Sequence, residues 1–125
     1  MKSVPRISEA EWEVLGVLWK KFPLTANEVF AALDKHGWKL NTVRTFLTRL
    51  EGKGIVTSHP GPDGKEFSPR IDRETCVRQA SRSFLQRVFE GATGALLLHF
   101  AKSERLSPSD LAELQAILDQ KRKGE

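Results

Sequence analysis

Apolar residues recur every three or four positions along most of the chain, which is the spacing of amphipathic helices. Ser8 and Glu11 precede the first such stretch as a Ser-x-x-Glu capping box, in which each side chain satisfies a backbone N–H that the first helical turn leaves unpaired. Thr25 and Glu28 repeat this arrangement before the second stretch, which we expect to close at His36-Gly37. The predicted apolar faces are Trp12, Leu15, Leu18 and Trp19 in the first helix, and Ala26, Val29, Phe30 and Leu33 in the second.

A third helix is predicted from residue 41 to residue 52, and its two faces differ in chemistry. Its apolar residues lie at positions i, i+3, i+4 and i+7 and form one arc: Val43, Phe46, Leu47 and Leu50. The opposite arc holds Asn41, Arg44, Thr45 and Thr48, with Thr42 and Arg49 at its flanks. No acidic residue occurs in this helix before Glu51. The helix therefore has an apolar back and a front of hydroxyl, amide and guanidinium groups.

A two-stranded hairpin is predicted next, because the β-prone run 54–60 is followed by the turn sequence Gly61-Pro-Asp-Gly64 and a returning run 65–69. Three helices followed by a hairpin is the order of elements in a winged helix-turn-helix. Further helices are predicted over 74–90, 94–101 and from Ser107-Pro108 onward. The predicted fold is mainly α, with a winged-helix domain over 1–73 and a helical region over 74–125.

The helical region has more apolar residues than a segment of about 50 residues can bury alone. Six of them recur on its predicted helix faces: Val77, Phe84, Val88, Leu98, Leu111 and Leu118. They could fold back on the winged helix or meet a second chain. We favour a second chain, and so a homodimer.

Charge is concentrated in the middle of the chain. The net charge of the 125 residues is +4, and the stretch 36–73 holds seven Lys or Arg against four Asp or Glu. This is the stretch in which a nucleic-acid contact is to be sought. The longest apolar run, residues 94–98, is too short to span a membrane, and residues 1–6 lack the apolar segment of a secretory signal. We therefore expect a cytoplasmic protein.

The third helix suits the major groove of double-stranded DNA. Arginine bonds guanine, asparagine bonds adenine, and the threonine methyl packs on the thymine methyl. The residues predicted to contact bases are Asn41, Thr42, Arg44, Thr45 and Thr48; those predicted to contact phosphates are Arg49, Lys53 and Lys65. The alternative is an ordinary solvent-exposed helix face with no binding role, although threonine is not a favoured surface residue in helices. A protein-interaction module is the second hypothesis, and an apolar or acidic front would have favoured it.

Other chemistry has little support in the sequence. The single cysteine, Cys76, excludes an intramolecular disulfide; it is either a packed residue, which we favour, or a redox-sensitive thiol at a helix start. His36, His59 and His99 lie in different predicted elements, so no metal site and no cofactor are expected. A glycine-rich phosphate loop and a paired nucleophile and base are also missing, and we predict no enzyme.

The sequence also resembles the penicillinase repressor family (BlaI/MecI/CopY type). The motifs are Ile7-Ser-Glu-Ala-Glu-Trp-Glu-Val-Leu15, Trp38…Asn41-Thr-Val-Arg-Thr45, and Leu97-Leu-His-Phe-Ala-Lys with the leucines that follow it. The resemblance covers nearly the whole chain. It implies a homodimer that represses transcription from a palindromic operator. Leu40 and Asn41 stand where the resistance repressors have Pro and Lys, which implies a different operator sequence.

The resemblance further implies induction by proteolysis, triggered by a membrane metalloprotease sensor and directed at the dimerisation helices. The family has Asn-Phe at the cleavage position, and His99-Phe100 is the matching pair here. The copper-responsive branch has a C-terminal cysteine cluster, which this chain lacks.

Overall fold

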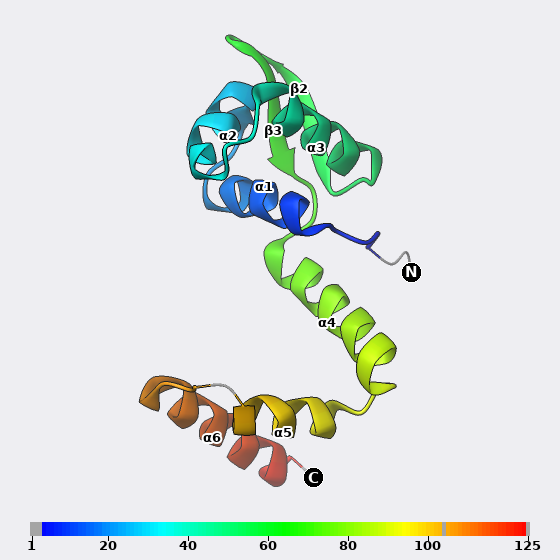
Figure 1. The fold of residues 1–125 in the computed structure, drawn as a ribbon, viewed down its shortest axis with the longest axis vertical. Coiled ribbons are helices and arrows are strands. Elements are labelled where there is room, and N and C mark those ends of the chain that lie inside the picture. The colour runs from blue at the N-terminus through cyan, green and yellow to red at the C-terminus, as the bar shows by residue number, and fades with distance from the viewer. Residues whose placement is uncertain (1–3, 104, 125) are drawn as a thin grey trace. The chain divides into compact units, whose positions relative to one another are not determined.

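The computed structural model describes residues 4–103 and 105–124, and among these it leaves the side chains of Val88, Phe89 and Thr93 undescribed. The chain forms two compact units that divide between Arg82 and Ser83. Figure 1 follows the order of the elements along the chain. The boundary predicted at 73/74 coincides with the start of a helix, and the two units divide further along that helix.

The first two helices begin where the capping boxes predict. Helix α1 (Glu9–Lys20) is capped by Ser8, whose hydroxyl accepts the Glu11 N–H at 3.2 Å while its own N–H donates to the Glu11 carboxylate at 2.9 Å. Helix α2 (Ala26–Ala32) is capped in the same way by Thr25 and Glu28. The expected closure at Gly37 is confirmed, but the last turn is a separate 3₁₀ helix, η1 (Asp34–His36). Gly37 follows it with φ of 69°, a conformation that glycine adopts without steric cost.

Helix α3 (Leu40–Gly52) has the two faces predicted for it. Val43, Leu47 and Leu50 on its back are completely buried, and Phe46 is half-buried against them. The remaining core side chains come from α1, α2 and the cap residue that follows it, the sheet and the residue just before β2, and the first turn of α4. The full buried apolar set is Val14, Leu15, Leu18, Leu24, Val29, Leu33, Val43, Leu47, Leu50, Ile55, Val56, Phe67 and Cys76.

The sheet has three strands rather than the two predicted. Strands β2 (Val56–Gly61) and β3 (Gly64–Pro69) form the expected hairpin, with Gly61 opposite Gly64. Strand β1 (Leu24–Thr25), just before α2, pairs antiparallel with β3 on its other edge, so that β3 is central. A strand of two residues is too short to show an alternating pattern, and its pairing partner lies about 40 positions away, so the sequence alone does not predict it.

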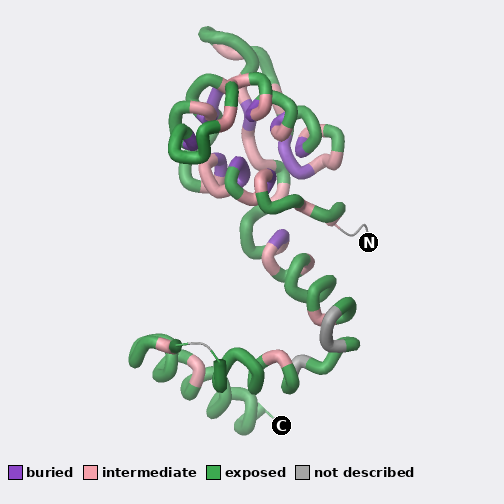
Figure 2. Tube along the Cα trace, viewed as in Figure 1, coloured by how far each residue is buried: buried purple, intermediate pink, exposed green. Residues whose placement is uncertain are grey.

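The C-terminal helices are α4 (Arg73–Phe89), α5 (Thr93–Ser103) and α6 (Pro108–Lys123). The predicted cap of α6 is present, since Ser107 and Asp110 form a third capping box. Figure 2 shows the buried residues gathered in the N-terminal unit, and no described side chain from 83 onward is buried. Val88, predicted on the apolar face, lies outside the described side chains. None of the helices in the described part of the chain is both long and apolar enough to cross a membrane.

Three helices and a hairpin, with α3 packed by its back onto the core, make the N-terminal unit a winged helix-turn-helix. The predicted fold class is confirmed. The indole N–H of Trp19 in α1 donates to the Ile71 carbonyl at 3.0 Å, and so ties α1 to the segment that leads from the wing into α4. This framework fixes the position of α3 relative to the hairpin.

Candidate nucleic-acid interface

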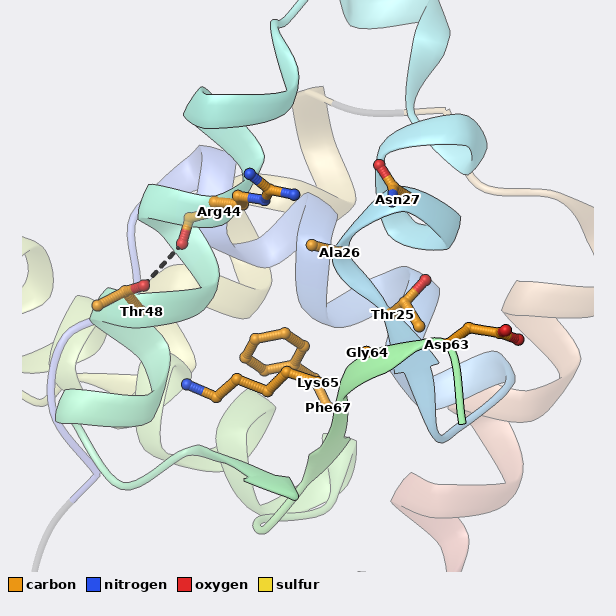
Figure 3. A pocket seen from close by; sticks show the side chains of 9 residues that line it. All are labelled: Thr25, Ala26, Asn27, Arg44, Thr48, Asp63, Gly64, Lys65 and Phe67. Atoms are coloured by element: carbon orange, nitrogen blue, oxygen red, sulfur yellow. Dashed lines mark hydrogen bonds between the residues drawn. The ribbon is translucent and has the colours of Figure 1, made fainter. Parts of the chain in front are cut away.

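The front of α3, the first turn of α2 and the wing surround one open groove (Figure 3). Its volume is about 340 Å³. The residues that line it are Thr25, Ala26, Asn27, Arg44, Thr48, Asp63, Gly64, Lys65 and Phe67. The groove therefore brings together Arg44 and Thr48 of α3 and Lys65 of the wing, three side chains that the sequence selected from two separate elements.

The threonines of α3 are held by their own helix. The Thr45 hydroxyl donates to the Asn41 carbonyl and the Thr48 hydroxyl donates to the Arg44 carbonyl, each at 2.9 Å. Both side chains are exposed. Because the hydroxyl hydrogen is used within the helix, each threonine presents a methyl group and an oxygen acceptor to a ligand.

The basic residues of α3 are available for a partner. Arg44 and Arg49 are exposed, and neither side chain forms an ion pair or hydrogen bond with the described residues. Asn41 is also exposed, whereas Thr42 is half-buried. Five donors on each guanidinium are therefore free to bond base edges or phosphate oxygens.

Lys53 has a different environment from the one predicted. Its ammonium donates to the Glu11 carboxylate and to the Arg6 carbonyl, both at 2.7 Å. Glu11 is only 1% exposed, so Lys53 neutralises a buried charge. Burial alone would raise the pKa of Glu11, but the Lys53 ammonium and the Ser8 N–H outweigh it and lower that pKa. This geometry favours a structural role for Lys53 over the predicted phosphate contact.

Glu51, near the end of α3, connects this helix to the wing. One carboxylate oxygen accepts a hydrogen bond from the Ser58 hydroxyl of β2, and the other lies 3.5 Å from the Lys65 ammonium of β3. The Lys65 ammonium also lies 5.6 Å from the centre of the Phe67 ring. The hydrogen bond from Ser58, assisted by Lys65, holds the pKa of Glu51 below its usual value against the opposing effect of burial.

Two further residues of the groove were missed. Asn27 is exposed in the first turn of α2 and lines the groove opposite Arg44, as Figure 3 shows. The sequence feature that could have identified Asn27 is its position two residues after the cap Thr25, in the first turn of the second helix. Asp63, at the tip of the wing, adds a negative charge to the rim.

Cys76 is a packed residue, as we favoured. It is 1% exposed and belongs to the core. Burial, and then the negative charge of Asp72, raise the pKa of its thiol, which disfavours the reactive thiolate that a redox-sensitive role would need. Among the described residues no group of histidine, cysteine and carboxylate side chains could hold a metal ion.

His99 and Phe100, the candidate cleavage pair, lie in the second half of α5. Both side chains are exposed, with ring centres 5.5 Å apart. The His99 carbonyl accepts the Ser103 hydroxyl at 2.6 Å. The bond between the two residues is thus part of a formed helix.

Comparison with known proteins gives consistent matches over this fold. The family model described as Penicillinase repressor matches residues 7–120. The penicillinase repressor of Bacillus licheniformis is 36% identical over 121 residues, which cover 96% of this chain and 94% of that protein. The methicillin resistance regulatory protein MecI of Mammaliicoccus sciuri is 30% identical over 116 residues, covering 92% of this chain and 94% of that protein.

A solved structure matches the N-terminal unit. It is the solution structure of the monomeric form of Bacillus licheniformis BlaI in complex with the blaP half-operator. The identity is 38% and the TM-score 0.52, and the match covers 60% of this chain and 93% of that chain.

Proposed function

Because the chain belongs to the penicillinase repressor family, we propose that it is a transcriptional repressor that binds double-stranded operator DNA through α3 and the wing. One observation carries the proposal: the back of α3 is buried while its polar front faces a groove shared with Lys65. The relatives are named as repressors and regulatory proteins, so the family is one of transcriptional repressors and not of enzymes. A repressor of this kind acts on the chromosome, so we place it in the cytoplasm.

We assign the contacts by chemistry. Those to base edges are made by Asn41, Thr42, Arg44, Thr45 and Thr48. Arg49 and Lys65 bond phosphates and hold α3 in the major groove. Asn27 joins them from α2, because it lines the same groove. Lys53 is assigned to the fold, since two of its three donors are already used.

The test is fluorescence anisotropy of the protein with duplex DNA from its own promoter, at several salt concentrations, beside a duplex of random sequence. We expect Arg44→Ala to weaken promoter binding by about 1–3 kcal/mol and to relax sequence preference. Arg122→Ala is the matched control, since Arg122 is exposed in the last turn of α6 and its loss changes the net charge equally.

Equal, weak binding of the wild-type chain to both duplexes would overturn sequence-specific repression. Absence of binding at low salt would favour the protein-interaction module instead. An Arg44→Ala variant that matches Arg122→Ala would remove Arg44 from the interface.

We also propose that the repressor is a homodimer assembled by its C-terminal unit. Large apolar side chains of α5 and α6 are exposed there, including Leu98 at 60%, Leu111 at 52% and Ile117 at 51%. A soluble chain that exposes this much apolar surface buries it against a partner. A second copy is the occupant we favour, because a two-fold dimer presents two α3 helices to the two halves of a palindrome.

Sedimentation of Leu98→Glu tests this assembly, with Ser109→Glu as the control at an exposed polar position in the first turn of α6. Leu98→Glu should sediment as a monomer that still binds a half-operator but loses affinity for the full operator. A wild-type monomer at micromolar concentration would overturn the homodimer.

A second function concerns inactivation. We propose that a membrane metalloprotease sensor triggers cleavage between His99 and Phe100, because cleavage there would separate the exposed leucines of α5 from those of α6. Co-expression with such a sensor should yield a fragment of residues 1–99 by mass spectrometry. An intact chain after induction would overturn this mode of release.

A further inference from the structure

We propose that Glu51 is a positioning residue that limits the affinity of the interface for DNA, because its carboxylate competes with DNA phosphate for the Lys65 ammonium. The inference rests on the proposed function and deepens it. Glu51 touches no base in this scheme. It acts through Lys65 and so decides when the charge of that lysine becomes available to DNA.

The geometry places Glu51 at the junction of the two DNA-contacting elements. It lies in the last turn of α3, while Ser58 and Lys65 lie on neighbouring strands of the wing. One carboxylate oxygen is fixed by the Ser58 hydroxyl, which leaves the other oxygen facing the Lys65 ammonium at 3.5 Å. Lys65 is 59% exposed and lines the groove together with Arg44 and Thr48.

A negative charge such as that of Glu51 is unfavourable at a surface that binds phosphate, so its presence there needs a physical reason. It is the only acidic residue in α3, and it stays ionised because the Ser58 hydroxyl and Lys65 hold its pKa below the usual value. A carboxylate beside the DNA backbone is repelled by it. A hydroxyl-bearing or amide side chain could join α3 to Ser58 without that repulsion. The negative charge is therefore explained by its effect on Lys65.

The effect depends on distance. At long range the two opposite charges of an ion pair nearly cancel. Lys65 therefore adds little attraction while DNA is loosely associated and its phosphates are a Debye length away. Once α3 is seated in the major groove, a phosphate within hydrogen-bond distance forms a charge-assisted bond that replaces Glu51. That bond separates Lys65 from Glu51 and leaves the Glu51 carboxylate beside the DNA backbone, so Glu51 lowers the affinity of the seated complex more than that of the loose one.

The variant Glu51→Gln tests this directly, because the amide oxygen still accepts the Ser58 hydroxyl while the competing charge is gone. On promoter DNA, where α3 is seated and Lys65 must leave Glu51, we expect affinity to rise about two- to fivefold, the range given by an exposed ion pair. The slope of log affinity against log salt should steepen by about one phosphate contact. A random-sequence duplex, which does not seat α3, should gain less.

Two comparisons make the test specific. Glu74→Gln changes the net charge equally, but Glu74 is paired with Arg78 at 3.2 Å in α4 and does not line the groove that Lys65 lines. In a Lys65→Gln background, Glu51→Gln should raise affinity clearly less, since only the direct repulsion between Glu51 and the DNA backbone is then removed. Thermal unfolding of each variant checks that the winged helix is intact.

Glu51→Gln and Glu74→Gln with equal effects would overturn the inference, since general charge would then explain the gain. A gain of the same size in the Lys65→Gln background would overturn it as well. Both results require a wild-type chain that binds DNA. A wild-type chain that binds neither duplex would instead overturn the proposed function, and this inference with it.

Discussion

Replacing Lys53 with methionine should destabilise the N-terminal unit strongly, although the lysine lies partly at the surface. The substitution removes the two 2.7 Å hydrogen bonds to Glu11 and to the Arg6 carbonyl, and leaves a carboxylate that is 1% exposed without its countercharge. Breaking a buried ion pair on one side costs about 3–5 kcal/mol. Lys53 keeps 30% of its side chain exposed, so water can partly replace the ammonium. We therefore expect a loss of about 2–3 kcal/mol, close to the value of a hydrogen bond to a charged group.

The assay is urea unfolding followed by tryptophan fluorescence. Trp12, Trp19 and Trp38 all belong to the N-terminal unit, so their emission follows this unit rather than the C-terminal helices. With a slope of about 1–1.5 kcal/mol per molar urea, the midpoint should fall by about 2 M. The double variant Glu11→Gln/Lys53→Met should recover much of the loss, because no ionised carboxylate remains to be buried.

Lys20→Met is the matched control. Lys20 is exposed in the last turn of α1, and its side chain has no ion pair among the described residues. We expect its loss to change stability by no more than about 0.5 kcal/mol. The reasoning is refuted if Lys53→Met unfolds at the same urea concentration as Lys20→Met. A Lys53→Met variant of normal stability but weaker DNA binding would restore the phosphate contact predicted from the sequence.

Three further outcomes are expected. The pKa of Glu11 is lowered in the fold, so its contribution to stability is present above the unfolded pKa and is lost as pH falls through the folded value. The difference in urea midpoint between wild type and Glu11→Gln should therefore shrink on going from about pH 6 to about pH 3. A difference that stays constant would contradict this. Cys76, with a raised pKa and 1% exposure, should react with a thiol reagent only after urea unfolding, and rapid labelling of the native chain would contradict its burial. Thr48→Ser removes the methyl group but keeps the hydroxyl bond to the Arg44 carbonyl, so promoter affinity should fall while binding to random DNA stays unchanged; an equal loss on both would exclude a methyl contact with a base.

The sequence predicted those parts of the fold that depend on neighbouring residues. Capping boxes join residues three positions apart, so the starts of α1 and α2 were predicted correctly, and the adjacent pair Ser107-Pro108 marked the start of α6. The two faces of α3 follow from helical periodicity in the same way. The shared position of Arg44, Thr48 and Lys65 on one groove was also predictable, because a winged helix places the hairpin beside its third helix.

Contacts between distant parts of the chain were not predictable. Lys53 was selected as a phosphate contact from its charge and its place after α3, but its partner Glu11 lies 42 residues earlier. No periodic pattern connects these two positions. Strand β1 was missed for the same reason, since its partner in β3 is equally distant. In both cases tertiary packing decided the outcome.

The division of α3 into a buried back and an exposed front has a consequence for how such a protein can change over time. Val43, Leu47 and Leu50 bear the packing, and the side chains of the front bear almost none of it. If the front makes the proposed base contacts, substitutions there would alter the preferred DNA sequence at little cost in folding free energy. A duplicated gene could acquire a new operator through a few such exchanges while its product keeps the same scaffold.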